Sequence, residues 1–461
     1  MTTLHKPVRI LVAAATSLGL SGAVQAQSLT SALEAAYQNS GLLEQNQALL
    51  RVADEDVMRA GAALLPVVSW TASVGQSYRD ASPGGYSESA SSTVGLRASM
   101  TLYDFGAGQL GIDQASEAVQ STRQQLIGVE QSVLLQAIEA FMQYRQASEL
   151  VRLRENNLKV IDRELQAAND RFEVGEITRT DVAMAESSKA QSLSALAQAR
   201  GDLTRAREAY INAVGKAPQS PSAPSALPDL PDSAAIAKAV AGRGHPDILA
   251  AQSQVKQAEL GLAQAELALM PTVSLTGSVS LGDTFNSTNY SNSASIGLEA
   301  SMPIYQGGAL DSSIRAATNR VDSAKAALRF TTLKVDMQVG AAYARLAVAR
   351  ANVQAIDQQI DAAQIAFDGV REEATLGART TLDVLNAEQN LLDAKANRVV
   401  AGNEVIVAVY SVLSALGQLT AQNLGLNVDL FDPEAYAAEV KQTQSSMRGM
   451  QLDKVLGKIG K

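Results

Sequence analysis

The 461-residue sequence contains no cysteine. This absence excludes disulfide bonds, thiolate metal sites, a cysteine nucleophile and lipidation of an N-terminal cysteine. Histidine occurs twice, and aromatic residues make up 4% of the chain, too few for the core of a typical enzyme of this length. The formal net charge of -9 gives no electrostatic support for a nucleic-acid partner. The composition therefore argues against an enzyme and against a nucleic-acid-binding protein.

Motifs of the common enzyme classes are missing as well. The sequence has no Gly-x-Ser-x-Gly, no phosphate-binding loop and no clustered metal ligands. His245 precedes Pro246 where a helix is expected to begin, which favours a structural role. We therefore predict no catalytic residue, no cofactor and no metal site.

Residues 1–26 are typical of a secretory signal peptide. Lys6 and Arg9 precede an apolar stretch over residues 10–20, and Val24-Gln25-Ala26 places small residues at positions -3 and -1 of a cleavage site. An anchor helix is the alternative, but the stretch is short. No later apolar run approaches the ~18–20 residues of a membrane helix. The mature protein is expected to be exported, and to be either soluble in the periplasm or held by a β-barrel.

The remaining sequence consists of two copies of one repeat unit. Residues 98–103 (ASMTLY) recur as residues 300–305 (ASMPIY), an offset of 202. Further matches at this offset are Gly175 with Gly377, Thr178 with Thr380, Asp181 with Asp383, Glu186 with Glu388, and Gly215 with Gly417. An internal repeat of this kind predicts a duplicated structural unit. We predict a first repeat over residues 27–216, a linker over 217–232, a second repeat over 233–420 and a polar C-terminal tail over 421–461, poorly ordered at its end.

Helical periodicity dominates both repeats. Residues 107–173 carry two apolar seams at seven-residue spacing, the pattern of coiled-coil packing. Such a helix is about 100 Å long, and residues 309–375 repeat it. Residues 178–215 and 380–417 return from short turns. Residues 28–64 and 233–269 are expected to be single helices that stop before a proline.

Between the helices, the hairpins 66–104 and 271–305 have the two-residue period of strands. Each of the four strands is expected to run for about ten residues, the span of a tilted membrane strand. Polar loops are expected over residues 79–91 and 282–293. The apolar face predicted to contact lipid carries Trp70, Val94, Leu96, Val273 and Leu298. A small soluble sheet packed on the helices is the alternative.

Four strands do not close a membrane barrel. Unpaired backbone groups in hydrocarbon cost several kcal/mol each, and the smallest usual barrel has about eight strands. Two or more chains are therefore expected to contribute to one barrel.

With these features the sequence resembles the TolC-type outer-membrane factors. The resemblance is carried by the duplicated layout, by residues 102–106 (LYDFG) and by residues 377–385 (GARTTLDVL). It implies a mainly α protein with a transmembrane β-barrel part: a homotrimer with a 12-stranded barrel in the outer membrane and a helical tunnel through the periplasm. It also implies a periplasmic adaptor protein and an inner-membrane transporter or ATPase as partners, with outer-membrane lipid around the barrel.

The resemblance further implies a gate at the periplasmic end. Asp383 matches an acidic family position, and a second acid expected three residues later is Asn386 here, which weakens a cation-selective ring. Arg379 matches a basic residue that ties neighbouring helices, with Asp181 and Thr180 as its expected acceptors. The turns at Gly175, Glu176, Gly377 and Ala378 are expected to dock the adaptor.

A structural interpretation of the same residues stays open. Thr178 with Asp181, and Thr380 with Asp383, have the spacing of capping boxes, so each acid can serve the helix start, the gate or both. Gly175 and Gly377 are explained by the turns themselves.

The function predicted is a passive exit duct of an efflux pump or a type I secretion system. A structural or adhesive coiled-coil protein of the cell surface is the alternative, and it leaves the amphipathic hairpins unexplained. The sequence names no cargo.

Overall fold

The computed structural model describes residues 28–224, 226–285 and 290–442. The predicted signal peptide and the end of the predicted tail lie outside these ranges. The elements in chain order are α1 (Leu29–Asn39), α2 (Gly41–Ala62), β1 (Val67–Ala81), β2 (Gly85–Tyr103), α3 (Ala107–Glu173), α4 (Arg179–Val214), α5 (Ala234–Gly244), α6 (Pro246–Leu267), β3 (Thr272–Thr284), β4 (Tyr290–Ser301), α7 (Ala309–Thr375), α8 (Thr381–Ala415) and α9 (Pro433–Gln442). The same order of two helices, two strands, a long helix and a returning helix therefore occurs twice.

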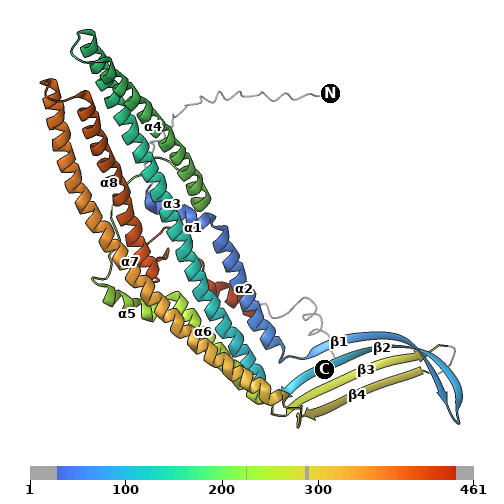
Figure 1. Ribbon diagram of the computed structural model, residues 1–461. Helices are drawn as coiled ribbons and strands as arrows, with labels where there is room; N and C mark the ends of the chain where they lie inside the picture. Colours follow the sequence, from blue (N-terminus) through green and yellow to red (C-terminus); the bar gives the residue numbers. More distant parts are fainter. Residues whose placement is uncertain (1–27, 225, 286–289, 443–461) are drawn as a thin grey trace, which may run out of the picture.

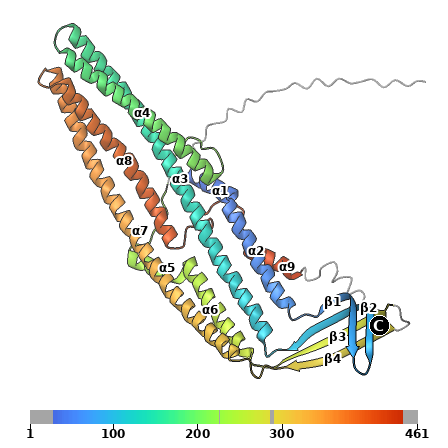
Figure 2. The same ribbon diagram turned by 45° about the vertical axis from the view of Figure 1, so that its right-hand side comes forward.

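Two long helical hairpins run side by side, one made of α3 and α4 and the other of α7 and α8 (Figure 1). The four-stranded sheet lies at the end opposite the hairpin tips. Helix α2 packs on α3 in the half nearer the sheet, and α6 contacts both α3 and α7 there (Figure 2). Nearer the tips, α8 takes over the contact with α3. The two hairpins are thus joined by α6 close to the sheet and by α8 farther away.

The long helices match the sequence prediction residue for residue. Helices α3 and α7 each have 67 residues, which makes them about 100 Å long. Their hairpin turns contain Gly175 at φ 78° and Gly377 at φ 77°, in the left-handed region where glycine carries no steric penalty. The heptad spacing therefore identified these helices correctly, and the glycines mark where each chain reverses.

The helices predicted over 28–64 and 233–269 are each divided in two, which the sequence prediction missed. Ser40 interrupts the first, and its side chain accepts a hydrogen bond from the N–H of Leu43 at 3.2 Å as the N-cap of α2. His245 interrupts the second, and its Nδ1 accepts from the N–H of Asp247 at 3.1 Å. Pro246 follows at the first helical position, where its missing N–H costs nothing. His245 is therefore a helix cap, in line with the structural role expected for it.

The predicted polar tail begins as a packed segment. Ala421 and Leu426 are buried in the core that surrounds Leu33 and Phe141. The N–H of Ala421 donates to Glu130 Oε1 at 2.6 Å, and α9 packs against α2 (Figure 2). Burial raises the pKa of Glu130. This part of the tail belongs to the folded body of the protein.

The expectation that no later segment is long and apolar enough to cross a membrane is wrong for α8. This helix is long and apolar enough to cross a membrane by length and composition, and 39% of its most apolar stretch is buried. Its residues Ala408, Val409 and Val412 pack in the core beside α7. Core helices of globular proteins share this composition, so one such helix is weak evidence of a membrane span.

Candidate functional site

The four strands form one antiparallel sheet in the order β1-β2-β3-β4. They have 15, 19, 13 and 12 residues, so the predicted length of about ten was too short. The stretches expected as polar loops are mostly strand, because polar residues keep the pairing: Asp80 pairs with Tyr86, and the hydroxyls of Ser280 and Ser293 lie 2.7 Å apart. Polar composition therefore marks the outer part of the sheet, beyond its apolar band.

The register places the apolar residues of all four strands on one face. Trp70 pairs with Leu96, Leu96 with Val279, and Val279 with Ala294. Directly opposed residues point to the same side of a sheet. A second apolar row on that side is formed by Met100, Leu275 and Leu298. Val94 and Val273 lie two residues from members of these rows, so all five residues predicted to contact lipid share one face.

The opposite face is polar. Arg97 lies between Ser69 and Ser278 in the register, and the hydroxyls of Ser278 and Ser295 are 2.9 Å apart. Within the described part of the chain, β1 pairs only with β2 and β4 only with β3. The sheet thus has one apolar face, one polar face and two open edges.

At the hairpin tips, the two predicted capping boxes are formed. Asp181 Oδ2 accepts from the N–H and hydroxyl of Thr178 at 2.9 and 2.7 Å. Asp383 Oδ2 accepts from the N–H and hydroxyl of Thr380 at 3.0 and 2.8 Å. These hydrogen bonds lower the pKa of both acids, the hydroxyl of Thr178 having the largest effect on Asp181 and the backbone N–H of Thr380 on Asp383. Both carboxylates therefore serve the starts of α4 and α8.

Arg379 has a partner that the sequence prediction missed. Its Nε lies 2.8 Å from Oε2 of Glu373, and both side chains are half exposed. The hydrogen bond to Glu373 raises the pKa of Arg379. Within this chain, Asp181 is held by Thr178. The signal that could have found this pair is that Glu373 and Arg379 are six residues apart, one on each side of a predicted turn.

The predicted docking turns are exposed at the tips, and each carries an apolar side chain that the sequence prediction missed. Val174 is 72% exposed and Leu376 is 81% exposed. They precede Gly175 and Gly377 and are equivalent residues of the two repeats. An apolar residue in an exposed turn of both repeats was the signal that could have found them.

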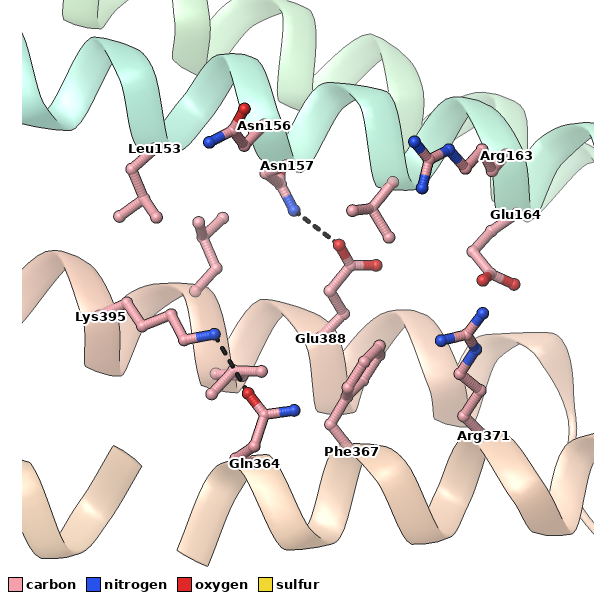
Figure 3. Close-up of a pocket in the computed structure, with 13 residues that line it drawn as sticks. Leu153, Asn156, Asn157, Arg163, Glu164, Gln364, Phe367, Arg371, Glu388 and Lys395 are labelled. Carbon is pink, nitrogen blue, oxygen red and sulfur yellow. Dashed lines mark hydrogen bonds between the residues drawn. The ribbon is translucent and has the colours of Figure 1, made fainter. Parts of the chain in front are cut away.

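Glu388 lies in the seam between the two hairpins, and only 6% of it is exposed (Figure 3). The amide Nδ2 of Asn157 in α3 donates to Glu388 Oε1 at 3.1 Å. Ser192 of α4 donates to Asn157 Oδ1 at 3.4 Å. Burial raises the pKa of Glu388 to about 7. The sequence marked Glu388 as the repeat partner of Glu186, but assigned it no role.

Among the residues that the structure describes, no group of three His, Asp or Glu side chains is placed to hold a metal ion. What the fold offers instead is a sheet with one face suited to lipid and one suited to water. The hairpins joined to it are far longer than the roughly 30 Å core of a bilayer. This combination defines a subunit of a membrane channel with a helical extension.

Comparison with known proteins identifies the family. The chain belongs to the outer membrane efflux protein family, whose model matches residues 32–216 and 240–418. The chain is 36% identical to the outer membrane efflux protein BepC of Brucella suis biovar 1 (strain 1330) over 452 residues, which cover 97% of this chain and 98% of BepC. It is 26% identical to the outer membrane protein TolC of Salmonella enteritidis, over 90% of this chain and 87% of TolC.

The fold is shared with solved channels. A membrane protein from Pseudomonas aeruginosa superposes with a TM-score of 0.76 at 20% identity, covering 87% of this chain and 92% of that protein. The protein is therefore an efflux-family component of the outer membrane with an extension into the periplasm, and it is not an enzyme. The predicted family, fold class and location are confirmed.

Proposed function

We propose that three copies of this chain form a passive exit duct for efflux or secretion, with a barrel in the outer membrane and a helical tunnel below it. The open edges of the sheet carry the proposal, since its apolar face needs lipid and its edges need partners. Three sheets of four strands give a 12-stranded barrel. The resemblance to TolC-type proteins supports three as the number of copies.

The internal repeat supports a specific contact between copies. Helix α8 covers one face of α3, where Asn157 is buried. The equivalent face of α7 is exposed in the single chain, because Gln359, at the position of Asn157, is exposed. Helix α7 also carries large exposed apolar residues, namely Phe330, Leu333, Met337, Val348 and Ile365. The repeat equivalent of α8 is α4. We therefore place α4 of one copy on α7 of the next.

This arrangement fixes a register. Within the chain, Glu388 of α8 meets Asn157 of α3 at 3.1 Å. The residues at the same repeat positions are Glu186 of α4 and Gln359 of α7, which again pair a carboxylate with an amide. Both are exposed in the single chain. Glu186 of one copy is therefore proposed to face Gln359 of its neighbour.

The hairpin tips are proposed as the gated periplasmic end. Asp383 is proposed to face the pore, with Asn386 in place of a second acid. In the closed end, one link per copy joins Arg379 to Asp181 and Thr180, and Glu373 competes for Arg379. What supports this is the position of Arg379 and Asp181 beside the two equivalent turns, both at exposed tips. The exposed Val174 and Leu376 add apolar contact area to the adaptor-docking turns Gly175, Glu176, Gly377 and Ala378.

Energy for transport is proposed to come from an inner-membrane transporter or ATPase, reached through the adaptor. BepC is named an efflux protein, which supports export of small molecules as the first activity to test. Export is measured as drug susceptibility of a strain that lacks its own duct and receives this chain together with a cognate adaptor and pump.

Cysteine cross-linking tests the assembly directly, because the chain has no cysteine of its own. We expect the Glu186→Cys/Gln359→Cys variant to form disulfide-linked dimers and trimers. The matched control, Asn157→Cys/Glu388→Cys, carries its pair inside one chain and is expected to stay monomeric on the same non-reducing gel. A detergent-independent monomer without ion conductance in planar bilayers would overturn the proposal and favour the adhesive coiled-coil alternative.

A further inference from the structure

Glu388 is a buried acid whose hydrogen bonding is incomplete. Its Oε1 accepts from Asn157, while its buried Oε2 has no hydrogen-bond partner. A buried carboxylate that is only partly satisfied destabilises its surroundings most when it is charged. The seam that holds Glu388 is therefore expected to respond to the charge of this one side chain.

Glu388 lies where a change in its charge affects the contact between the two helical hairpins. The hydrogen bonds from Ser192 to Asn157 and from Asn157 to Glu388 connect α4, α3 and α8, and thus tie one helical hairpin to the other. Beside Glu388 lies a cavity of about 280 Å³ that opens between the hairpins, with Phe367 on its α7 wall (Figure 3). The cavity gives the ionised side chain space to turn away from Asn157, and this movement would break the hydrogen bond that ties α8 to α3.

Charged groups face Glu388 from every helix around the cavity. Helix α3 contributes Arg163 and Glu164, α7 contributes Arg371, and α8 contributes Lys395. Lys395 Nζ donates to Gln364 Oε1 at 3.1 Å, and Figure 3 shows Arg371 directed toward Glu164. Lys395 and Arg371 thus have another partner or direction, and the effect of burial on the charge state of Glu388 exceeds theirs.

We propose that Glu388 is a protonation switch that sets how tightly the two helical hairpins of each chain are held together. When Glu388 is neutral the seam between α3 and α8 is closed, and when it is ionised the seam loosens toward the tips. The proposal rests on the proposed function in one respect: in an assembled duct, this loosening widens the periplasmic end.

The direction of the pH dependence follows from the two states of the side chain. Burial raises the pKa of Glu388 to about 7 in the closed seam, against 4.5 for the free side chain. Below pH 4.5 the acid is neutral in both states and the seam carries no charge penalty. The penalty grows as the pH rises from 4.5 and is complete above about 7. The seam therefore loosens as the pH rises.

Spin labels measure the seam without any need for conduction. One label is placed on each hairpin, at Asn169→Cys of α3 and Leu382→Cys of α8, both exposed positions on the tip side of Glu388. In purified protein diluted with unlabelled chains, we expect the label separation within one chain to increase between pH 5 and pH 8, within the range that the pKa of about 7 sets. Adding Glu388→Gln is expected to hold the closed distance at every pH. Adding Glu372→Gln, which removes an exposed acid of the same hairpin, is expected to leave the profile unchanged.

Two further variants separate a switch from a merely structural residue. Glu164 raises the pKa of Glu388 and Arg371 lowers it. Glu164→Gln is therefore expected to move the midpoint to lower pH, and Arg371→Gln to move it to higher pH. A label distance that is constant with pH, or a profile that persists in Glu388→Gln, would overturn the switch. If the labels respond and planar bilayers show no conductance, the switch stands and the proposed duct fails.

Discussion

Arg379 and Glu373 form an ion pair of 2.8 Å that spans the turn between α7 and α8. Both side chains are half exposed, so the pair contributes little to global stability. It does hold the guanidinium of Arg379 on a residue of its own hairpin in this conformation. The two partners proposed for Arg379, Glu373 and Asp181, therefore give opposite expectations for variants at the tips.

Arg379→Ser is expected to raise single-channel conductance in planar bilayers, because it removes the link that narrows the periplasmic end. Glu373→Gln frees Arg379 to pair with Asp181, so this variant is not expected to raise the conductance. Arg179→Ser, which removes a cation stacked on Phe172 at the other tip, is the matched control. The melting temperature of all three is expected to stay unchanged. If Arg379→Ser does not raise the conductance, the proposal that Arg379 and Asp181 hold the end narrow is wrong.

Acid is expected to fray the first turns of α4 and α8. Hydrogen bonds from Thr178 and Thr380 lower the pKa of Asp181 and Asp383 below 3.8. An acid whose pKa is lowered in the folded state stabilises the fold at pH values above its ordinary pKa of 3.8. This contribution is lost as the pH falls through the lowered pKa. Amide protection factors, which correct for the pH dependence of free exchange, measure the fraying at each helix start. Asp383→Asn is expected to remove the pH dependence from α8 and leave it in α4.

A charge on the apolar face of the sheet is expected to block assembly. Leu96→Arg and Leu298→Arg each place a charge in lipid, at a cost of about 2–4 kcal/mol near the bilayer midplane. Thr276→Arg is the control, because Thr276 lies opposite Ser99 on the polar face. Heat-resistant oligomers on gels and recovery from outer-membrane fractions measure the outcome. Stable oligomers of Leu96→Arg would show that this face does not contact lipid.

The segment after residue 420 is expected to contribute to stability. Leu426 is buried in the core with Leu33 and Phe141, and Leu426→Ala is expected to cost about 2–5 kcal/mol of unfolding free energy. Leu430, four residues later, is half exposed. Leu430→Ala is therefore expected to change the unfolding free energy by less than about 0.5 kcal/mol. Denaturant unfolding compares the two variants. Equal stability would mean that this segment is not part of the folded core in solution.

Periodicity alone determined much of this protein. The seven-residue step over 107–173 and 309–375 identified helices that match the structure, because side-chain spacing along a helix is a local property. The two-residue alternation likewise placed Trp70, Leu96 and Leu298 on one face of the sheet. Capping spacing identified Thr178 and Thr380 as the N-caps of α4 and α8. Each of these features depends on neighbours within a few residues, which a sequence displays directly.

The tertiary structure decided what depends on distant neighbours. Glu186 and Glu388 occupy the same place in the two repeats, yet Glu186 is exposed and Glu388 is buried. The reason is that α8 packs against α3, the long helix of the other hairpin, whereas α4 does not pack closely against α7 within the described part of the chain. The partner of Arg379 and the length of the strands also depended on contacts across turns and between strands. A repeat sequence specifies equivalent side chains, but their burial, and with it their pKa, is set by which helix lies against them.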